Sequence, residues 1–201
     1  MIPRYSRKQV SDIWSDEARF KIWLDIEILA CEAQANLGII PKSAVKNIKA
    51  KAKFNTKRVL QIEEKVKHDI IAFLTNVAEY VGMDSRFIHM GMTSSDVVDT
   101  CLSVQMKMAG EIILKDLIDV RESLKKKAKK YKYLTQIGRT HGVHAEPITL
   151  GLKFALWYDE MNRNIDRMKR AIDTISVGQI SGAVGTYEHL SPKVEAYVCK
   201  K

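Results

Sequence analysis

The sequence predicts an all-α protein, with an N-terminal helical domain followed by the first long antiparallel helices of a central helical bundle. Three observations support this fold class. Apolar residues recur every three or four positions along most of the chain, which is the period of an amphipathic helix. Only 4 prolines and 10 glycines interrupt the 201 residues, so turns are few. No internal repeat and no convincing strand pattern accompanies the helical period.

The N-terminal helical domain is expected to occupy residues 1–92. Its first long helix should span about residues 16–37, because Ser15 can cap its start and Gly38 is suited to end it. The apolar stripe of this helix consists of Ile22, Ile26, Leu29, Ala33 and Leu37. A short helix should follow Pro41.

A second long helix of this domain should run from about Thr56 to Val81 and end at Gly82. Its apolar stripe consists of Val59, Ile62, Val66, Ile70, Phe73, Val77 and Tyr80. The charged segment Lys67–Asp69 then falls in the middle of a helix, and His68 lies off the stripe.

The second predicted domain covers residues 93–201 and forms the first part of a central long-helix bundle, truncated in this sequence. The longest helix should begin near Ser95 and reach about Lys130, which is on the order of 50 Å at about 1.5 Å per residue. A small compact domain cannot surround such a rod, so a bundle, a coiled coil or other subunits must cover it. A loop at residues 136–147 should join it to a helix near residues 154–175. The C-terminal tail is rich in small residues and is expected to be flexible.

The formal net charge of +9 makes polyanions candidate partners. These are nucleic acid, an acidic membrane surface, or a small substrate that carries phosphates and carboxylates. Part of the excess lies in one lysine run, which contains Lys125, Lys126, Lys127, Lys129, Lys130 and Lys132. The simplest interpretation of this run is a solvated helix face.

The three cysteines, Cys31, Cys101 and Cys199, are far apart and show no CxxC spacing. This distribution favours a reducing compartment and disfavours a disulfide framework or a zinc site. The first residues lack the apolar core of a signal peptide, and no apolar run reaches the roughly 20 residues that cross a bilayer. We therefore expect a soluble cytoplasmic protein.

The predicted loop contains Arg139–Pro147, a segment dense in groups that can take part in catalysis. His141 lies beside a glycine, and an imidazole titrates in the range that suits proton transfer near neutral pH. The alternative is a turn whose histidines only satisfy backbone groups. The spacing of His141 and His144 also suits a metal pair, but no third ligand is evident, which disfavours a metal site.

Other segments carry weaker candidates. Met92–Asp96 precedes the longest helix, where hydroxyls and free N–H groups can bind an anion; an ordinary N-cap is the alternative. Lys67–Asp69 supplies either binding groups or merely solvent-exposed charge, and His89 adds a second imidazole. Arg4 and Tyr5 lie at a terminus that would ordinarily fray. No nucleophile elbow, phosphate loop or dinucleotide fingerprint accompanies these segments.

Three motifs that occur in this order on the long helices resemble those of the fumarase/aspartase superfamily: MTSSDVVDT, GRTHGVHAEP and SGAVGTY. The resemblance covers essentially the whole chain, and it narrows to the adenylosuccinate lyases. The motifs that narrow it are the opening RYS, the KHD at residues 67–69 and the residues of GRTHGVHAEP. The resemblance implies an all-α homotetramer whose active sites are assembled from several subunits. It also implies β-elimination of fumarate from adenylosuccinate to leave AMP, and from succinyl-aminoimidazole-carboxamide ribotide in purine biosynthesis, without a cofactor.

The roles that this resemblance implies carry over residue by residue. His141 matches the general acid that protonates the departing nitrogen, and Thr140 is a binding neighbour. His89 matches a histidine close to the substrate phosphate. Thr93 and Ser94 match groups that hold the succinyl part. The remaining matches bind substrate: Arg4 and Tyr5 at the nucleotide-binding start, and Lys67, His68 and Asp69.

The sequence departs from the family pattern in one respect. The family's flexible loop, with a serine base and a nearby lysine, lies beyond residue 201, as do a glutamine and the C-terminal domain. We therefore expect a fragment that lacks the base and has no useful lyase activity alone.

Two alternative functions remain. One is another superfamily member such as an argininosuccinate lyase, which the RYS and KHD matches disfavour. The other is a non-catalytic basic helical module for oligomerisation or nucleic-acid binding, but the lysine run lacks interleaved aromatic residues. A small, multiply charged substrate explains the basic charge without nucleic acid or a membrane.

Overall fold

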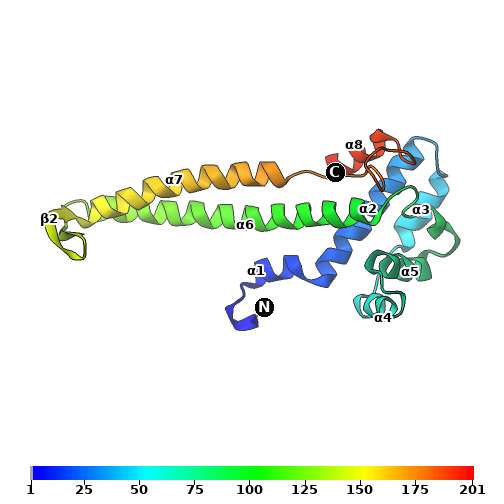
Figure 1. The fold of residues 1–201 in the computed structure, drawn as a ribbon, viewed down its shortest axis with the longest axis horizontal. Coiled ribbons are helices and arrows are strands. Elements are labelled where there is room, and N and C mark those ends of the chain that lie inside the picture. The colour runs from blue at the N-terminus through cyan, green and yellow to red at the C-terminus, as the bar shows by residue number, and fades with distance from the viewer. Residues whose placement is uncertain (1) are drawn as a thin grey trace. The chain divides into compact units, whose positions relative to one another are not determined.

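The computed structural model describes residues 2–201 and is built almost entirely of helices, which confirms the all-α prediction (Figure 1). The chain forms two compact units. The first combines the described residues up to Met106 with Ser176–Lys201, and the second is Lys107–Ile175. The domain boundary expected after residue 92 stays a prediction.

The first unit is a cluster of short and medium helices. Its elements in chain order are η1 (Pro3–Tyr5), α1 (Lys8–Ser11), η2 (Asp12–Trp14), α2 (Asp16–Asn36), α3 (Lys42–Lys51), α4 (Thr56–Val66), α5 (Asp69–Val81), η3 (Gly82–Phe87) and α8 (Pro192–Lys200). The first turns of α6 (Ser94–Lys130) also belong to it.

Helix α2 is the central element of this unit. Its start is capped as predicted, since the Ser15 hydroxyl accepts a hydrogen bond from the N–H of Ala18 at 3.2 Å. The aromatic rings of Phe20, Trp23 and Phe73 pack in the core with centroids 5.2 to 5.7 Å apart. The sequence predicted that α2 buries one apolar stripe, and this was wrong. Side chains on several sides of α2 are buried, because α3, α4 and α8 all pack against it.

The single helix expected at residues 56–81 is two helices, α4 and α5, so that prediction was wrong. Lys67 interrupts it with a φ of 55°, in the left-handed region, and its N–H ends α4 by donating to the Glu63 carbonyl at 2.8 Å. His68 then caps α5, because its Nδ1 accepts from the N–H of Ile71 at 3.4 Å. The Lys-His-Asp segment therefore lies at a helix junction and not within a helix.

The C-terminal tail packs into the core of the first unit, so the expectation of a flexible tail was wrong. Ile180 and Val194 are fully buried there. The small residues permit this packing, since a Cβ on Gly178 would lie 2.8 Å from the sulfur of Cys199. The tail also contains a regular element, α8, that sequence periodicity did not predict.

The second unit contains two long helices. The 37-residue helix α6 enters it from the first unit and agrees with the predicted longest helix. Helix α7 (Leu150–Ile175), which agrees with the predicted second helix, returns alongside α6 (Figure 1). The two approach closely, since a Cβ on Gly110 would lie 2.9 Å from the Ile172 side chain. Across residues 2–201, no helix combines the length and apolarity that a membrane span requires.

A β-hairpin joins α6 to α7, where the sequence predicted a loop at residues 136–147. Strands β1 (Thr135–Thr140) and β2 (Val143–Thr149) pair antiparallel. The loop prediction was wrong because His141 and Gly142 form a two-residue turn with φ of 51° and 77°. Positive φ at both turn residues matches the twist of paired strands and favours a hairpin.

Candidate active site

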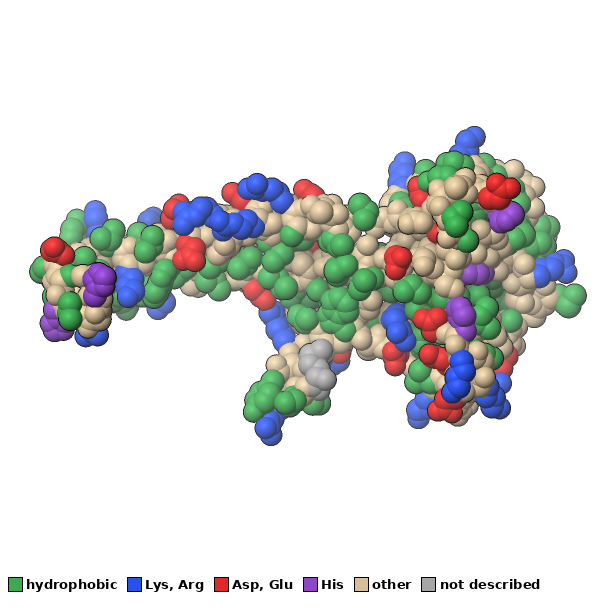
Figure 2. All heavy atoms as spheres, viewed as in Figure 1, with side chains coloured by type: hydrophobic (Ala, Val, Ile, Leu, Met, Phe, Trp, Pro, Cys, Tyr) green, Lys and Arg blue, Asp and Glu red, His purple; other side chains and the backbone are tan. Residues whose placement is uncertain are grey.

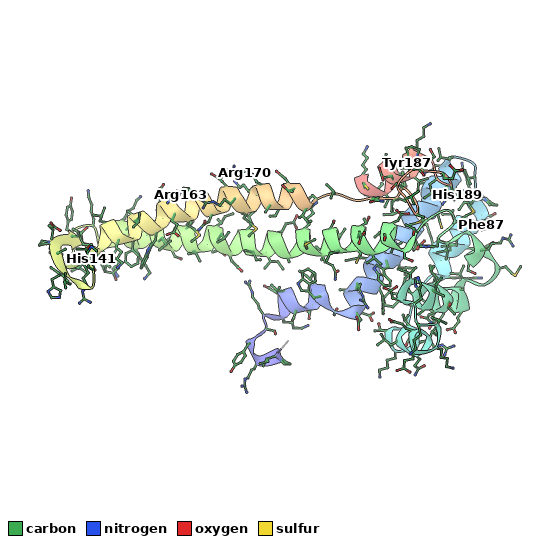
Figure 3. All side chains as sticks on the ribbon, viewed as in Figure 1. Phe87, His141, Arg163, Arg170, Tyr187 and His189 are labelled. Carbon is green, nitrogen blue, oxygen red and sulfur yellow. The ribbon has the colours of Figure 1, made fainter. Side chains whose placement is uncertain are left out.

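The hairpin turn presents His141 to solvent (Figure 3). Within residues 2–201, its ring forms no hydrogen bond. Thr140, which ends β1 directly before the turn, is also exposed. An imidazole whose ring nitrogens form no hydrogen bond within the protein can exchange a proton with a ligand that reaches it. His141 is therefore accessible for the acid role that was predicted for it.

A hollow of about 630 Å³ lies between this hairpin and the start of α7. Two cationic side chains, Arg139 and Lys153, line it. Apolar side chains also line it, among them Leu152 and Leu156, which are 60% and 62% exposed. Mixed cationic and apolar walls suit an organic anion or a side chain from a neighbouring chain.

The Thr-Ser cluster lies at the N-terminus of α6, as predicted. The N–H of Thr93 donates to Oδ2 of Asp96 at 3.0 Å, and the N–H of Asp96 donates to the Thr93 carbonyl at 3.1 Å. Thr93 is therefore the N-cap residue of this helix, and Asp96, at the third helical position, bonds back to its N–H as in a capping box. The hydroxyls of Thr93 and Ser94 are half-buried and form no hydrogen bond within the described chain, which leaves them available to a ligand.

The buried carboxylate of Asp96 also joins two of the motifs. Its Oδ1 accepts from the N–H of Ser181 at 3.0 Å, and its Oδ2 accepts from the N–H of Gly182 at 3.1 Å. Tyr187, labelled in Figure 3, holds the C-terminal end of the SGAVGTY segment, since its hydroxyl donates to Glu195 at 2.7 Å. That bond raises the pKa of the phenol. The SGAVGTY segment is thereby fixed beside the start of α6.

His89 is paired with a buried glutamate of α2. Its Nδ1 lies 2.6 Å from Oε1 of Glu27, and its backbone N–H donates to Oε2 at 2.9 Å. Burial lowers the pKa of the imidazole, but the hydrogen bond to Glu27 and the negative charges of Glu27 and Asp96 outweigh it. The net pKa of His89 is therefore raised, which favours the imidazolium form.

The other predicted binding residues lie at the surface. Lys67 and His68 are exposed, and Nδ1 of His68 lies 3.4 Å from the carboxylate of Asp69. Arg4 and Tyr5 are exposed in η1, with the guanidinium 4.8 Å from the ring centroid. No hydrogen bond or ion pair between described residues joins these two groups to each other or to the start of α6.

The predicted site residues are thus divided between the two units. The hairpin residues belong to the second unit, and the rest belong to the first. Within the first unit, His89–Ser94 is the segment held by buried partners. Sequence reasoning did not predict that Glu27 holds His89, nor that Asp96 anchors the start of α6. The sequence around Glu27 gave no clear signal for this role, because Asp25 and Glu32 lie nearby on the same helix.

Residues 4–201 match the model of a protein family described as lyase. The chain is 54% identical, over all 201 of its residues, to the adenylosuccinate lyase of Bacillus subtilis (strain 168), and covers 47% of that protein. It is 52% identical to the adenylosuccinate lyase of Synechocystis sp. (strain PCC 6803), again over all of this chain and 47% of the relative. The chain therefore spans about half the length of these curated relatives.

Solved structures give the same fold. A fumarate lyase from Mesorhizobium sp. BNC1 superposes with a TM-score of 0.91 at 26% identity, over 98% of this chain and 49% of that one. A β-carboxy-cis,cis-muconate cycloisomerase from Acinetobacter calcoaceticus sp. ADP1 superposes with a TM-score of 0.89 at 28% identity, over 96% and 48% of the two chains.

Proposed function

This chain belongs to the lyase family, and from that premise we propose that the protein containing it is an adenylosuccinate lyase. The identity of 54% over all 201 residues with one such enzyme is the observation that carries this assignment. The reaction is a β-elimination that releases fumarate from adenylosuccinate and leaves AMP. The same chemistry cleaves succinyl-aminoimidazole-carboxamide ribotide in purine biosynthesis.

In this mechanism, His141 is the general acid. A base removes a proton from the carbon beside a carboxylate, the C–N bond breaks, and its electron pair goes to nitrogen. That nitrogen takes a proton from His141. The exposed, unpartnered ring on the hairpin turn supports this role. We assign no base among residues 2–201.

The start of α6 holds the acidic part of the substrate. The unpartnered hydroxyls of Thr93 and Ser94, together with free N–H groups of the helix N-terminus, are donors suited to carboxylates. They also stabilise the negative charge that collects on the carboxylate when the C–H proton leaves. His89 adds a cation for the phosphate. The remaining substrate contacts come from Thr140, Arg4, Tyr5, Lys67, His68 and Asp69.

We further propose that the whole protein is a homotetramer in the cytoplasm. Exposed apolar residues on both long helices support assembly, since a large uncovered apolar surface is unusual in a monomer. Three free cysteines support a reducing compartment. The division of the candidate residues between two units is compatible with sites shared between subunits.

His141→Gln in the whole protein tests the acid role. We expect kcat for adenylosuccinate to fall by about 10²- to 10⁴-fold with little change in KM, since proton donation acts only in the transition state. Fumarate release, followed by ultraviolet absorbance, measures both constants. His144→Gln is the matched control, because that exposed histidine lies three residues further on in β2. Loss confined to KM, or a wild-type protein that does not cleave adenylosuccinate, would contradict the assignment.

A further inference from the structure

Glu27 is an unusual residue for its position. It lies on α2 among the buried side chains of Trp23, Ile26 and Ala30 and is only 1% exposed. An isolated carboxylate is costly to bury unless hydrogen bonds and an opposite charge compensate it. Both of its oxygens are used by a single residue, the backbone N–H and the Nδ1 of His89. No other residue of the described chain hydrogen-bonds to this carboxylate.

The backbone of His89 is held in a conformation that matches this two-point contact. Its φ is 64°, in the left-handed region that non-glycine residues rarely adopt. Such a conformation persists only where surrounding contacts compensate its cost. The paired bonds to Glu27 are contacts of this kind, since they anchor main chain and side chain of the same residue.

The pairing leaves one ring nitrogen unused. Because Nδ1 donates to a carboxylate, Nε2 is the nitrogen that remains, and it forms no hydrogen bond within residues 2–201. The side chain is 17% exposed, so a ligand can reach the ring. The charged groups that act on it are Glu27 of α2 and Asp96 of α6, and both favour the cation.

The position of this cation suits an anionic ligand. His89 precedes α6 by a single turn, in which its carbonyl accepts from the N–H of Met92 at 3.2 Å. The first N–H groups of a long helix attract anions. An imidazolium at the same helix end adds a charged donor to them.

We propose that Glu27 is a positioning residue, which holds His89 as an imidazolium with Nε2–H free to bind an anionic group of the substrate. This inference rests on the proposed function only for the identity of that substrate. The anionic group is either the phosphate or a carboxylate of adenylosuccinate, which share the chemistry of a negatively charged oxygen acceptor.

Glu27→Gln in the whole protein tests the inference. The amide keeps the shape, but it removes the charge that stabilises the imidazolium and leaves one acceptor oxygen for the two donors of His89. We expect KM for adenylosuccinate to rise about 10- to 100-fold, the size of one lost charge-assisted hydrogen bond, with a smaller change in kcat. Glu32→Gln is the matched control, because Glu32 also lies on α2 and bonds to Lys49 and Tyr197 instead. Equal kinetics for the two variants would overturn the inference.

Comparison with the dephosphorylated nucleoside substrate, succinyladenosine, identifies the anionic group. If the variant's rise in KM disappears with the nucleoside, His89 binds the phosphate. If it persists, His89 binds a carboxylate. Both results support a positioning role for Glu27.

Nitrogen-detected NMR of the wild-type protein gives an independent readout, should the Glu27 variant fail to fold. We expect Nδ1 of His89 to stay protonated in the neutral and in the cationic form of the ring. We also expect the pKa of the imidazole to exceed its ordinary value. An unprotonated Nδ1 would overturn the positioning role even if the enzyme is active. If the wild-type protein does not cleave adenylosuccinate but Nδ1 is protonated, the proposed function fails and the Glu27–His89 pairing stands.

Discussion

Lys67 closes α4 in a backbone conformation that normally belongs to glycine. Its φ of 55° lies in the left-handed region, which costs an ordinary residue about 1–2 kcal/mol. Glycine adopts this conformation without the cost and is the commonest residue at this position after a helix. The sequence therefore retains a lysine where stability alone would favour glycine, which agrees with the predicted binding role of Lys67.

Lys67→Gly is expected to stabilise the folded protein by about 0.5–1 kcal/mol, because the relief of strain exceeds the added flexibility of the unfolded chain. Urea denaturation measures the change. Gln61→Gly is the control, since Gln61 is an exposed residue in the middle of α4 where glycine should cost about 1 kcal/mol. Changes of the same sign in both variants would show that Lys67 is not strained.

The pairing of His89 with Glu27 makes stability depend on pH. The folded state raises the pKa of His89 above its unfolded value of about 6.5, so folding binds a proton between these two values. This stabilisation is complete below the unfolded pKa and is lost as pH rises through the folded pKa. We expect the free energy of unfolding to fall from about pH 6.5 upward, and the fall to be smaller in Glu27→Gln. Urea titrations at a series of pH values measure it; parallel curves would contradict it.

At the scale of elements, Asp96 is the connection between α6 and the returning tail. It is fully buried, and the amides of Ser181 and Gly182 depend on it for their hydrogen bonds. Removing a charged acceptor leaves the buried amide of Ser181 and the half-buried amide of Gly182 unsatisfied. The tail should then separate from the start of α6 more readily than the rest of the first unit.

Asp96→Ala is expected to destabilise the protein by about 3 kcal/mol or more, since each hydrogen bond to a buried charge contributes roughly 1.5–3 kcal/mol. Hydrogen exchange should also accelerate at Ser181 and Gly182. Asp99→Ala is the control, because Asp99 is an exposed acid one turn further along α6. Unchanged exchange at the two amides would exclude the anchoring role.

The sequence predicted the elements whose determinants are local. The start of α2 follows from Ser15, and the extents of α6 and α7 follow from uninterrupted apolar periods. No glycine or proline marks the break at Lys67, and the apolar residues keep their helical spacing on both sides of it. The sequence therefore predicted one continuous helix there. The hairpin strands are largely exposed and show little alternation, which hid the His-Gly turn.

The candidate site was predictable only in its individual residues. The motifs indicated His141, Thr93 and Ser94, because hydroxyls at a helix start and a histidine beside glycine are local patterns. The supporting contacts are not local: Glu27 meets His89 across 62 positions, and Asp96 meets Ser181 across 85. Such pairs depend on tertiary packing that periodicity does not describe.

At the scale of the whole molecule, the long helices expose apolar residues that the chain itself does not cover. Leu102, Ile113 and Val120 of α6 are 41% to 46% exposed, and Leu152 and Leu156 of α7 more so. Figure 2 shows hydrophobic side chains in groups along these helices. Burying such residues contributes about 25 cal/mol per Å² of apolar area, so the proposed pairing of these faces between copies of the chain would be favourable.

Leu156→Glu is expected to weaken the proposed homotetramer, because a charge would be buried where an apolar contact is proposed. Analytical ultracentrifugation of the whole protein should show smaller species for the variant and a four-chain mass for the wild type. Lys169→Glu, at an exposed position on the same helix, should leave the mass unchanged. A monomeric wild type, or a Leu156 variant of unchanged mass, would contradict the assembly.

The first unit is discontinuous, and this has a consequence for synthesis on the ribosome. Its core needs Ile180, Leu190, Val194 and Val198, yet the intervening residues of the second unit are translated before them. At roughly 5–20 residues per second, the nascent chain spends several seconds with Val97 and Cys101 lacking that cover. During this interval the apolar side chains that the tail will cover stay exposed to water, so we expect the first unit to complete its core only after the second unit has been translated.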